Sequence, residues 1–178
     1  MNSRLPVCWL TVCMLSLAPH ILRSQTAPEH HPWWVSVGAG PSWTAGTLTM
    51  NVGMVYSYQF EQSTINARII GLTNDNPTVQ RFDRSSVVYK MADYGILYGP
   101  IWNSSRGYFS AAAGIGLVRA EYGPSLQFTR STGVSLPLEL QWFWRPTTFF
   151  GAGVYAYGSL NTVKQMAGIM LCAQLGMW

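Results

Sequence analysis

Residues 47–60, TLTMNVGMVYSYQF, alternate between two kinds of side chain along their whole length. One series takes every second position from Leu48 to Phe60 and holds only Leu, Met, Val, Tyr and Phe. The other series holds Thr, Asn, Gly, Ser and Gln, with a single Val. Because successive side chains of a β-strand point to opposite faces, this pattern predicts one strand with an apolar face and a polar face.

The same alternation recurs from Trp33 to the end of the chain and predicts eight strands. Their expected ranges are 33–43, 46–60, 63–72, 87–101, 107–120, 126–141, 147–158 and 164–178. Such lengths match the roughly 9–11 residues, or somewhat more, with which a tilted strand crosses a bilayer. We therefore predict an all-β fold, an eight-stranded antiparallel up-and-down transmembrane β-barrel over residues 33–178.

The composition favours a membrane barrel over a soluble one. Only 10% of the residues are charged, against about 25% in a typical globular domain. A soluble barrel would carry Lys and Glu on its outer face, whereas the polar face here is mostly Gly, Ser, Thr and Asn. Small polar residues suit the interior of a narrow barrel, and a soluble surface so poor in charge would aggregate. The apolar face is therefore expected to contact lipid. The alternative is a soluble lipocalin-like barrel that binds an apolar ligand.

The N-terminus has the features of a secretory signal peptide over residues 1–24. Arg4 supplies the positive charge and residues 5–18 form a short apolar core. Cleavage is expected after Ser24, with Ala27 as the later alternative, and residues 25–32 form a polar lead-in to the barrel. A short membrane anchor is the alternative interpretation of this segment. An exported membrane barrel predicts the outer membrane of a Gram-negative bacterium.

Removal of the leader changes both the charge and the cysteine count. The formal charge falls from +4 to +2, because the loss of Arg4 and Arg23 leaves nine basic side chains against seven acidic ones. So small an excess gives little reason to expect a nucleic-acid partner. Cys8 and Cys13 are lost as well, which leaves Cys172 alone and excludes an internal disulfide and a cysteine-rich metal site. We expect Cys172 to be a small apolar filler.

Aromatic residues gather at alternate strand ends, which meet on one rim of an up-and-down barrel. Such a ring is typical of the lipid–water boundary of a membrane barrel. The expected interface residues are Trp33, Tyr56, Tyr58, Phe60, Trp102, Phe109, Trp142, Trp144, Phe150 and Trp178. The same ends carry Trp34, Tyr98, Tyr108, Phe143 and Phe149, which we assign to the same rim.

The expected connections are shorter on one side of the barrel than on the other. With periplasmic termini, the periplasmic joins are brief and two of the outer ones are long, as is typical of outer-membrane barrels. The expected joins are 61–62, 102–106 and 143–147 on the periplasmic side and 44–46, 72–87, 120–131 and 158–164 on the outer side.

With these features, the chain resembles the small eight-stranded outer-membrane β-barrels, the class of the OmpA transmembrane domain, OmpX and Ail. The resemblance covers about residues 33–178 and rests on the leader, the alternation, the aromatic rims, the loop polarity and the C-terminal aromatic residue. It implies the barrel fold and the outer-membrane location. No motif of a named subfamily is present, so the resemblance implies no functional residue.

The last strand departs from this class in one respect. Trp178 shares its face with Gly176 and Gln174, whereas the apolar residues from Ile169 to Met177 occupy the opposite face. Either a bulge shifts the register near the end of the strand or the terminal insertion signal is degenerate.

The positions of the histidines argue against an enzyme. The deacylase and phospholipase barrels of the outer membrane depend on a His beside a Ser. The chain has three histidines, His20, His30 and His31, and all precede the first expected strand. We therefore predict no catalytic residue, no cofactor and no metal. His30 and His31 with Glu29 are expected to belong to a solvated lead-in, because adjacent histidines in a flexible tail make a poor metal site.

Three ionisable residues share the inward face of the expected strands: Arg68, Asp93 and Glu139. Charges in a closed lumen must pair, because burial of an unpaired charge is costly. We expect Arg68 to pair with Asp93 or with Glu139 in a polar cluster that fills the lumen. A narrow channel is the alternative.

The outer connections are expected to carry a basic patch of Arg81, Arg84, Arg119, Arg130 and Lys164. A basic excess at the outer leaflet suits contact with lipopolysaccharide phosphates, and ordinary solvated loop charges are the alternative. The expected partners are membrane lipids, lipopolysaccharide among them, and the outer-membrane assembly machinery during insertion. The sequence thus predicts a non-enzymatic outer-membrane barrel with a structural or surface-interaction role. The alternatives are a porin-like narrow channel, a lipid-modifying enzyme and the soluble ligand binder.

Overall fold

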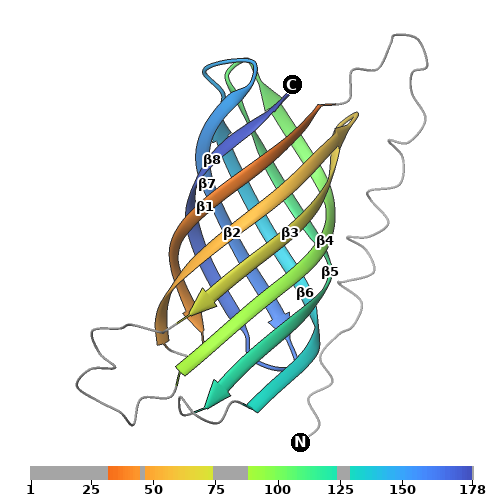
Figure 1. The fold of residues 1–178 in the computed structure, drawn as a ribbon. Coiled ribbons are helices and arrows are strands. Elements are labelled where there is room, and N and C mark those ends of the chain that lie inside the picture. The colour runs from red at the N-terminus through yellow and green to blue at the C-terminus, as the bar shows by residue number, and fades with distance from the viewer. Residues whose placement is uncertain (1–31, 45–46, 74–87, 124–128, 178) are drawn as a thin grey trace, which may run out of the picture. The chain divides into compact units, whose positions relative to one another are not determined.

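A computed structural model of the chain describes residues 32–44, 47–73, 88–123 and 129–177. Eight antiparallel strands, each paired with the next in sequence, form a closed barrel in which β8 pairs back with β1 (Figure 1). The strands are β1 (Trp33–Thr44), β2 (Thr47–Phe60), β3 (Ser63–Thr73), β4 (Val88–Ser104), β5 (Gly107–Gly123), β6 (Thr129–Trp144), β7 (Phe150–Asn161) and β8 (Met166–Met177). The predicted fold class is confirmed. Among the described residues, no helix is long and apolar enough to cross a membrane.

The barrel has two distinct ends. Trp33 at the start of β1 pairs with Met177 at the end of β8, so both chain ends of the barrel lie at one end, which we call the inner end. The β2–β3, β4–β5 and β6–β7 connections lie there too, and the other four connections lie at the opposite, outer end. In Figure 1 the inner end is at the top.

Several strands extend further than the alternation predicts. Trp102, Asn103 and Ser104 continue the ladder opposite Gly107–Phe109, so that only Ser105 and Arg106 separate β4 from β5. β5 and β6 also run about three residues past their expected ends, and β7 begins at Phe150. Backbone pairing carries on past the apolar pattern because ladder hydrogen bonds do not require apolar side chains. The expected join at 102–106 is therefore too long, and the expected join at 143–147 begins too early.

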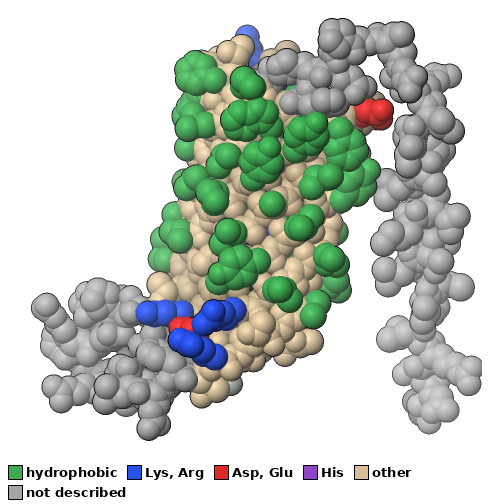
Figure 2. Space-filling view, turned by 45° about the vertical axis from the view of Figure 1, so that its right-hand side comes forward, with side chains coloured by type: hydrophobic (Ala, Val, Ile, Leu, Met, Phe, Trp, Pro, Cys, Tyr) green, Lys and Arg blue, Asp and Glu red, His purple; other side chains and the backbone are tan. Residues whose placement is uncertain are grey.

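The barrel wall is apolar outside, whereas polar and apolar side chains are buried together inside. On β2, Leu48, Met50 and Val52 are exposed, whereas Asn51 and Ser57 are buried in the lumen. Large apolar side chains cover the outer wall between the two ends (Figure 2). The exposed face is the reverse of that of a soluble protein, in which the exposed face of a sheet is polar.

β8 keeps one register over its described length. Its partners on β1 and β7 follow one constant offset from Met166 to Met177, so this part of the strand contains no bulge. Ile169 and Leu171 face outward, while Met170 and Cys172 face the lumen and are buried. A bulge within Met166–Met177 therefore does not account for the mismatch at Trp178, which lies outside the described residues.

Candidate functional site

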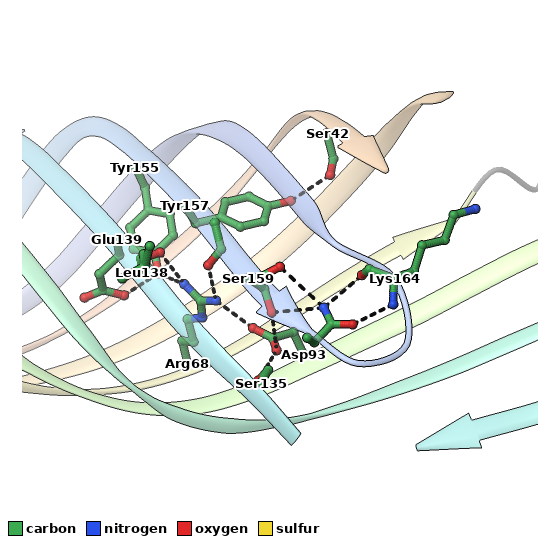
Figure 3. Close-up of polar contacts among 12 residues, drawn as sticks. Ser42, Arg68, Asp93, Ser135, Leu138, Glu139, Tyr155, Tyr157, Ser159 and Lys164 are labelled. Carbon is green, nitrogen blue, oxygen red and sulfur yellow. Dashed lines mark hydrogen bonds and ion pairs between the residues drawn. The ribbon is translucent and has the colours of Figure 1, made fainter. Parts of the chain in front are cut away.

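A buried ion pair lies inside the barrel. Arg68 on β3 and Asp93 on β4 are both buried, with 2.6 Å between Nη2 of Arg68 and Oδ2 of Asp93 (Figure 3). Arg68 also donates from Nη1 to the carbonyl of Leu138 on β6 at 2.9 Å, and from Nη2 to the carbonyl of Gly158 on β7 at 3.0 Å. One guanidinium therefore joins four strands, and its planar set of donors suits this use.

The second oxygen of Asp93 accepts two hydroxyl hydrogen bonds. Ser135 Oγ donates to Asp93 Oδ1 at 2.8 Å, and Ser159 Oγ donates to the same oxygen at 3.1 Å. Both carboxylate oxygens are thus satisfied, as burial of a charge requires. From the sequence, Arg68 was expected to pair with Asp93 or with Glu139, and in the structure its ion pair is with Asp93.

Glu139 lies in the same lumen but is separated from Arg68 by a tyrosine. Its Oε1 accepts from Asn66 Nδ2 and from Gln141 Nε2, the latter at 2.9 Å. Its Oε2 accepts from the hydroxyl of Tyr155, which in turn lies 3.5 Å from Nη1 of Arg68. We name Arg68, Asp93, Glu139 and Tyr155 the central cluster. Parity places Tyr155 and Asn66 on the inward face of their strands, but no sequence signal predicted their contacts with Glu139.

Three aromatic residues assigned to the rim face the lumen instead, which corrects that prediction. Trp34, Tyr108 and Phe143 are buried. Ring centroids are 5.1 Å apart for Trp34 and Tyr108 and 5.5 Å apart for Tyr108 and Phe143. The reason is parity: Trp34 follows the outward Trp33 directly, and only one of two successive strand residues can face out. We call Trp34, Tyr108 and Phe143 the inner aromatic cluster.

Arg145 closes this cluster at the inner end. Its guanidinium carbon lies 5.1 Å from the centroid of the Tyr108 ring, and Nη2 donates to Asn103 Oδ1 at 3.1 Å and to the carbonyl of Gly107 at 3.2 Å. Partial burial lowers the pKa of the Arg145 guanidinium from its ordinary value. That ordinary value lies so far above neutrality that the group stays charged. A charged group stacked on an aromatic face is a favourable contact.

The other rim aromatics that the structure describes point outward at the inner end. Trp33, Tyr56, Trp102, Phe109, Trp142, Trp144 and Phe150 are exposed, as are Tyr98 and Phe149, and Tyr58 and Phe60 are partly exposed. Neighbouring strands contribute pairs of rings, such as Trp33 with Tyr56 at 6.4 Å and Trp102 with Phe109 at 5.4 Å between centroids. These residues form an outward aromatic girdle at one end of the wall.

A set of charged residues occupies the outer end of the same wall. Arg119 on β5 and Arg130 on β6 each make an ion pair with Oε1 of Glu121, at 3.2 Å and 3.0 Å. Lys90 on β4 is the cross-strand neighbour of Glu121 and is exposed. We call Lys90, Arg119, Glu121 and Arg130 the outer basic cluster. Figure 2 shows it as basic side chains around an acidic one at the lower end of the apolar wall.

The five basic residues expected in the outer connections do not all lie in connections. Arg119 and Arg130 lie on strands, because Thr129–Ser131 pair with Ala120–Tyr122 and extend the sheet. Lys164 lies in the connection between β7 and β8. Arg81 and Arg84 lie outside the described residues.

No protein-family model matches the chain, and no curated protein matches its sequence. Solved structures do match. Ail, the attachment invasion locus protein of Yersinia pestis, is 15% identical over 84% of this chain and 100% of Ail, with a TM-score of 0.61. Ail in complex with the heparin analogue sucrose octasulfate is 14% identical over 84% and 100% of the two chains, with a TM-score of 0.62. Neisserial surface protein A is 10% identical over 83% of this chain and 95% of that one, with a TM-score of 0.59.

The fold is that of the small eight-stranded outer-membrane β-barrels. Identity this low carries the fold alone. The function of this small barrel has to be argued from its own residues, and within the part of the chain that the structure describes, charged side chains gather in the outer basic cluster and in the lumen.

Proposed function

We propose that this chain is a non-enzymatic integral protein of the bacterial outer membrane that acts through its outer end. Its lumen is closed, and its outer basic cluster binds the phosphates of lipopolysaccharide in the outer leaflet. The observation that carries the proposal is the place of that cluster, on the outward face and directly beyond the apolar wall.

The membrane location is supported by the distribution of apolar side chains. Large exposed residues such as Ile115, Leu136 and Leu171 cover the middle of the wall, and an aromatic girdle borders it at the inner end. A surface of this kind buries apolar area only in lipid. The predicted leader supplies the export step. Heat-modifiable gel migration of protein extracted from outer membranes tests the membrane location, and a protein that stays soluble without detergent would contradict it.

A closed lumen is supported by the size of the side chains inside it. Trp34, Arg68, Phe143 and Tyr155 are among the largest fully buried residues, and an eight-stranded barrel leaves little interior beyond its side chains. Conductance in planar bilayers tests the alternative of a narrow channel. We expect no open-channel conductance from the parent protein, and a large open conductance would overturn the closed lumen.

The absence of an enzyme activity is supported by the residues available. No histidine occurs after His31, and the buried hydroxyl of Ser159 is engaged with Asp93. A Ser–His nucleophile requires a histidine beside the serine, and the sequence has no histidine in the barrel segment. A lipid A mass spectrum from expressing cells tests this, with an unchanged spectrum as the expected result.

The outer basic cluster has an excess of positive charge directed outward. Three cations, Lys90, Arg119 and Arg130, surround one carboxylate, so the formal sum is +2. The arginine side chains remain 52% and 69% exposed despite their ion pairs. Guanidinium groups bind phosphate through two parallel hydrogen bonds. The complex of Ail with a sulfated heparin analogue adds support for a polyanion as the class of partner.

Binding to lipopolysaccharide tests the cluster directly. The double variant Arg119→Gln with Arg130→Gln is expected to bind lipopolysaccharide about tenfold more weakly than the parent, because two charge-assisted contacts are lost. Arg106→Gln is the matched control, since Arg106 is an exposed arginine at the inner end. Binding to dephosphorylated lipopolysaccharide and to heparin separates lipid phosphate from sulfated glycan. Equal affinity of parent and double variant for intact lipopolysaccharide would overturn the proposal.

A further inference from the structure

The connection between β7 and β8, residues 162–165, has a defined conformation that one side chain sets. Asn161 Oδ1 accepts from the backbone N–H groups of Val163 at 3.0 Å and Lys164 at 2.6 Å. Asn161 Nδ2 donates to the carbonyl of Lys164 at 2.8 Å. A short polar side chain that hydrogen-bonds to the backbone ahead of it fixes a turn. We call residues 162–165 the cap.

The cap folds toward the lumen. Val163 is partly buried and packs against the buried apolar residues inside the barrel. Gly133, at an inward position of β6, has no room for a side chain: a Cβ there would lie 2.4 Å from Thr162 Oγ1 and 2.8 Å from Val163 Cγ2. The cap therefore covers the inner face of β6 at the outer end of the barrel.

A series of hydrogen bonds connects the cap with the central cluster. Asn161 Nδ2 lies 3.3 Å from Ser159 Oγ, which donates to Asp93 Oδ1 at 3.1 Å. Oδ2 of Asp93 is the atom that pairs with Arg68. The directions agree along the whole series, because a hydroxyl can accept from the amide and donate to the carboxylate at the same time. Figure 3 shows this series from Arg68 and Asp93 through Ser159 to the backbone of Lys164.

We propose that the Arg68–Asp93 ion pair holds the cap over the outer end of the lumen, acting through Ser159 and Asn161. Arg68, Asp93 and Ser159 are positioning residues in this arrangement, because none of them touches the cap itself. Hydrogen bonds in series inside a protein reinforce one another, so a change at the buried pair reaches a segment at the barrel's end. The inference does not depend on lipopolysaccharide binding.

Trypsin provides a readout in the cap itself, because Lys164 is a cleavage site within it. Ser159→Ala removes the link between Asp93 and Asn161 and leaves the ion pair and the direct contacts of Asn161 in place. We expect cleavage after Lys164 in the folded full-length protein to become about tenfold faster, because protease attack follows the population of locally opened chain. The measurement is the rate at which the fragment that begins at Gln165 appears in the mass spectrum.

Ser110→Ala is the matched control. Ser110 is also a buried lumen serine, but its hydroxyl has no hydrogen-bond partner within the described protein. We expect its cleavage rate to equal that of the parent. If Ser110→Ala accelerates cleavage as much as Ser159→Ala, the effect is general loosening and the proposed coupling is wrong. Each variant is first checked for heat-modifiable migration, so that only folded barrels are compared.

Asn161→Ala separates the two parts of the proposal. It removes the direct contacts with the cap and is expected to give the fastest cleavage after Lys164. If Asn161→Ala opens the cap while Ser159→Ala cleaves at the parent rate, the cap stands and its coupling to the ion pair is overturned. If neither variant changes the rate, the cap as proposed is overturned too.

The buried thiol of Cys172 gives a second readout from inside the lumen. It is 6% exposed, and Cys8→Ala with Cys13→Ala makes it the single cysteine of the full chain. In this background, Ser159→Ala is expected to raise the labelling rate of Cys172 by a small charged thiol reagent severalfold, with Ser110→Ala unchanged. Equal rates for the two serine variants would contradict a cap that restricts access to the lumen.

Discussion

The described residues at the two ends of this barrel differ in their chemistry. At the inner end, the ring of Tyr108 stacks on Phe143 and contacts Trp34 at a tilt inside the lumen, and Arg145 lies over Tyr108. At the outer end, a polar turn held by Asn161 folds over the inside of the wall. Buried aromatic packing opens only at a high free-energy cost, whereas a hydrogen-bonded turn at the end of a barrel opens at a lower one. The inner end is therefore built as an anchor, and the outer end is the one suited to change.

The outside of the barrel repeats this difference. Aromatic residues border the apolar wall at the inner end, where rings sit well at a lipid–water boundary. Charged residues of the outer basic cluster border it at the outer end. Rings position a protein in any bilayer, but a set of guanidinium groups selects phosphate. The comparison supports the proposed interactive surface at the outer end, and the following experiments test it from the largest expected effect to the smallest.

Arg68→Leu should cause the largest loss of unfolding free energy, because Arg68 joins four strands inside the lumen. The variant leaves Asp93 buried without its counter-charge, and loss of one partner of a buried pair costs about 4 kcal/mol. Urea unfolding of the barrel in lipid vesicles, followed by tryptophan fluorescence, measures the loss. The double variant Arg68→Leu with Asp93→Leu should recover at least half of it. A loss below about 1 kcal/mol for the single variant would mean that the pair contributes little.

Phe143→Ala should destabilise the inner end by about 3 kcal/mol, because it leaves a cavity beneath Tyr108. Phe149→Ala is the matched control at the same end, where the side chain is exposed on the outside. The control should cost less than about 1 kcal/mol in the same unfolding experiment. Equal losses for the two phenylalanines would show that the inner aromatic cluster is not a packed anchor.

Ile115→Arg tests whether the wall faces lipid at all. Ile115 is 71% exposed and lies halfway along β5. An arginine on the lipid face near the midplane should cost about 2 kcal/mol in vesicles. On a water-exposed surface the same change would alter stability by no more than about 0.5 kcal/mol. Thr132→Arg, an outward position near the outer end, is the control with little expected cost.

Gly133→Ala should have the smallest effect on stability, and its effect should be confined to the cap. The added methyl group meets Thr162 and Val163, and the cap can yield at a cost of about 1 kcal/mol. Faster trypsin cleavage after Lys164 is the expected readout. Gly71→Ala is the control, because a Cβ at Gly71 would lie 4.0 Å from its nearest neighbour, the carbonyl of Val52. Identical cleavage of the two glycine variants would mean that Gly133 does not support the cap.

Much of the architecture could be predicted because side-chain alternation is a local property. The inward positions of Arg68, Asp93 and Glu139 followed from parity alone, and the structure has all three buried. The rim aromatics were predicted less well, because a residue's place near a strand end does not tell whether its side chain faces outward or into the lumen. Trp33 and Trp34 illustrate this: the two are adjacent, yet one is exposed and the other is buried. Parity was the signal that would have separated them.

The partners inside the lumen could not be predicted in the same way. Asp93 meets Ser135 and Ser159, which lie 42 and 66 positions away in the sequence. Glu139 meets Asn66, 73 positions away. The ends of β5 and β6 were also missed, because the backbone ladder continues through Glu121–Tyr122 on β5 and Trp142–Trp144 on β6, past the segments whose alternation predicted these strands. In each case the deciding contact lies between strands.

The sequence by itself determined the approximate strands, the face that parity gives to each strand residue and the charges of the lumen, because all of these follow from local order. Only the tertiary structure decided which inward residues meet. Closure of β8 on β1 sets one register around the whole barrel. That register brings Arg68, Asp93, Ser159 and Asn161 into one series of hydrogen bonds from three different strands. No local pattern contains it, because it depends on how far each strand is shifted against its neighbours.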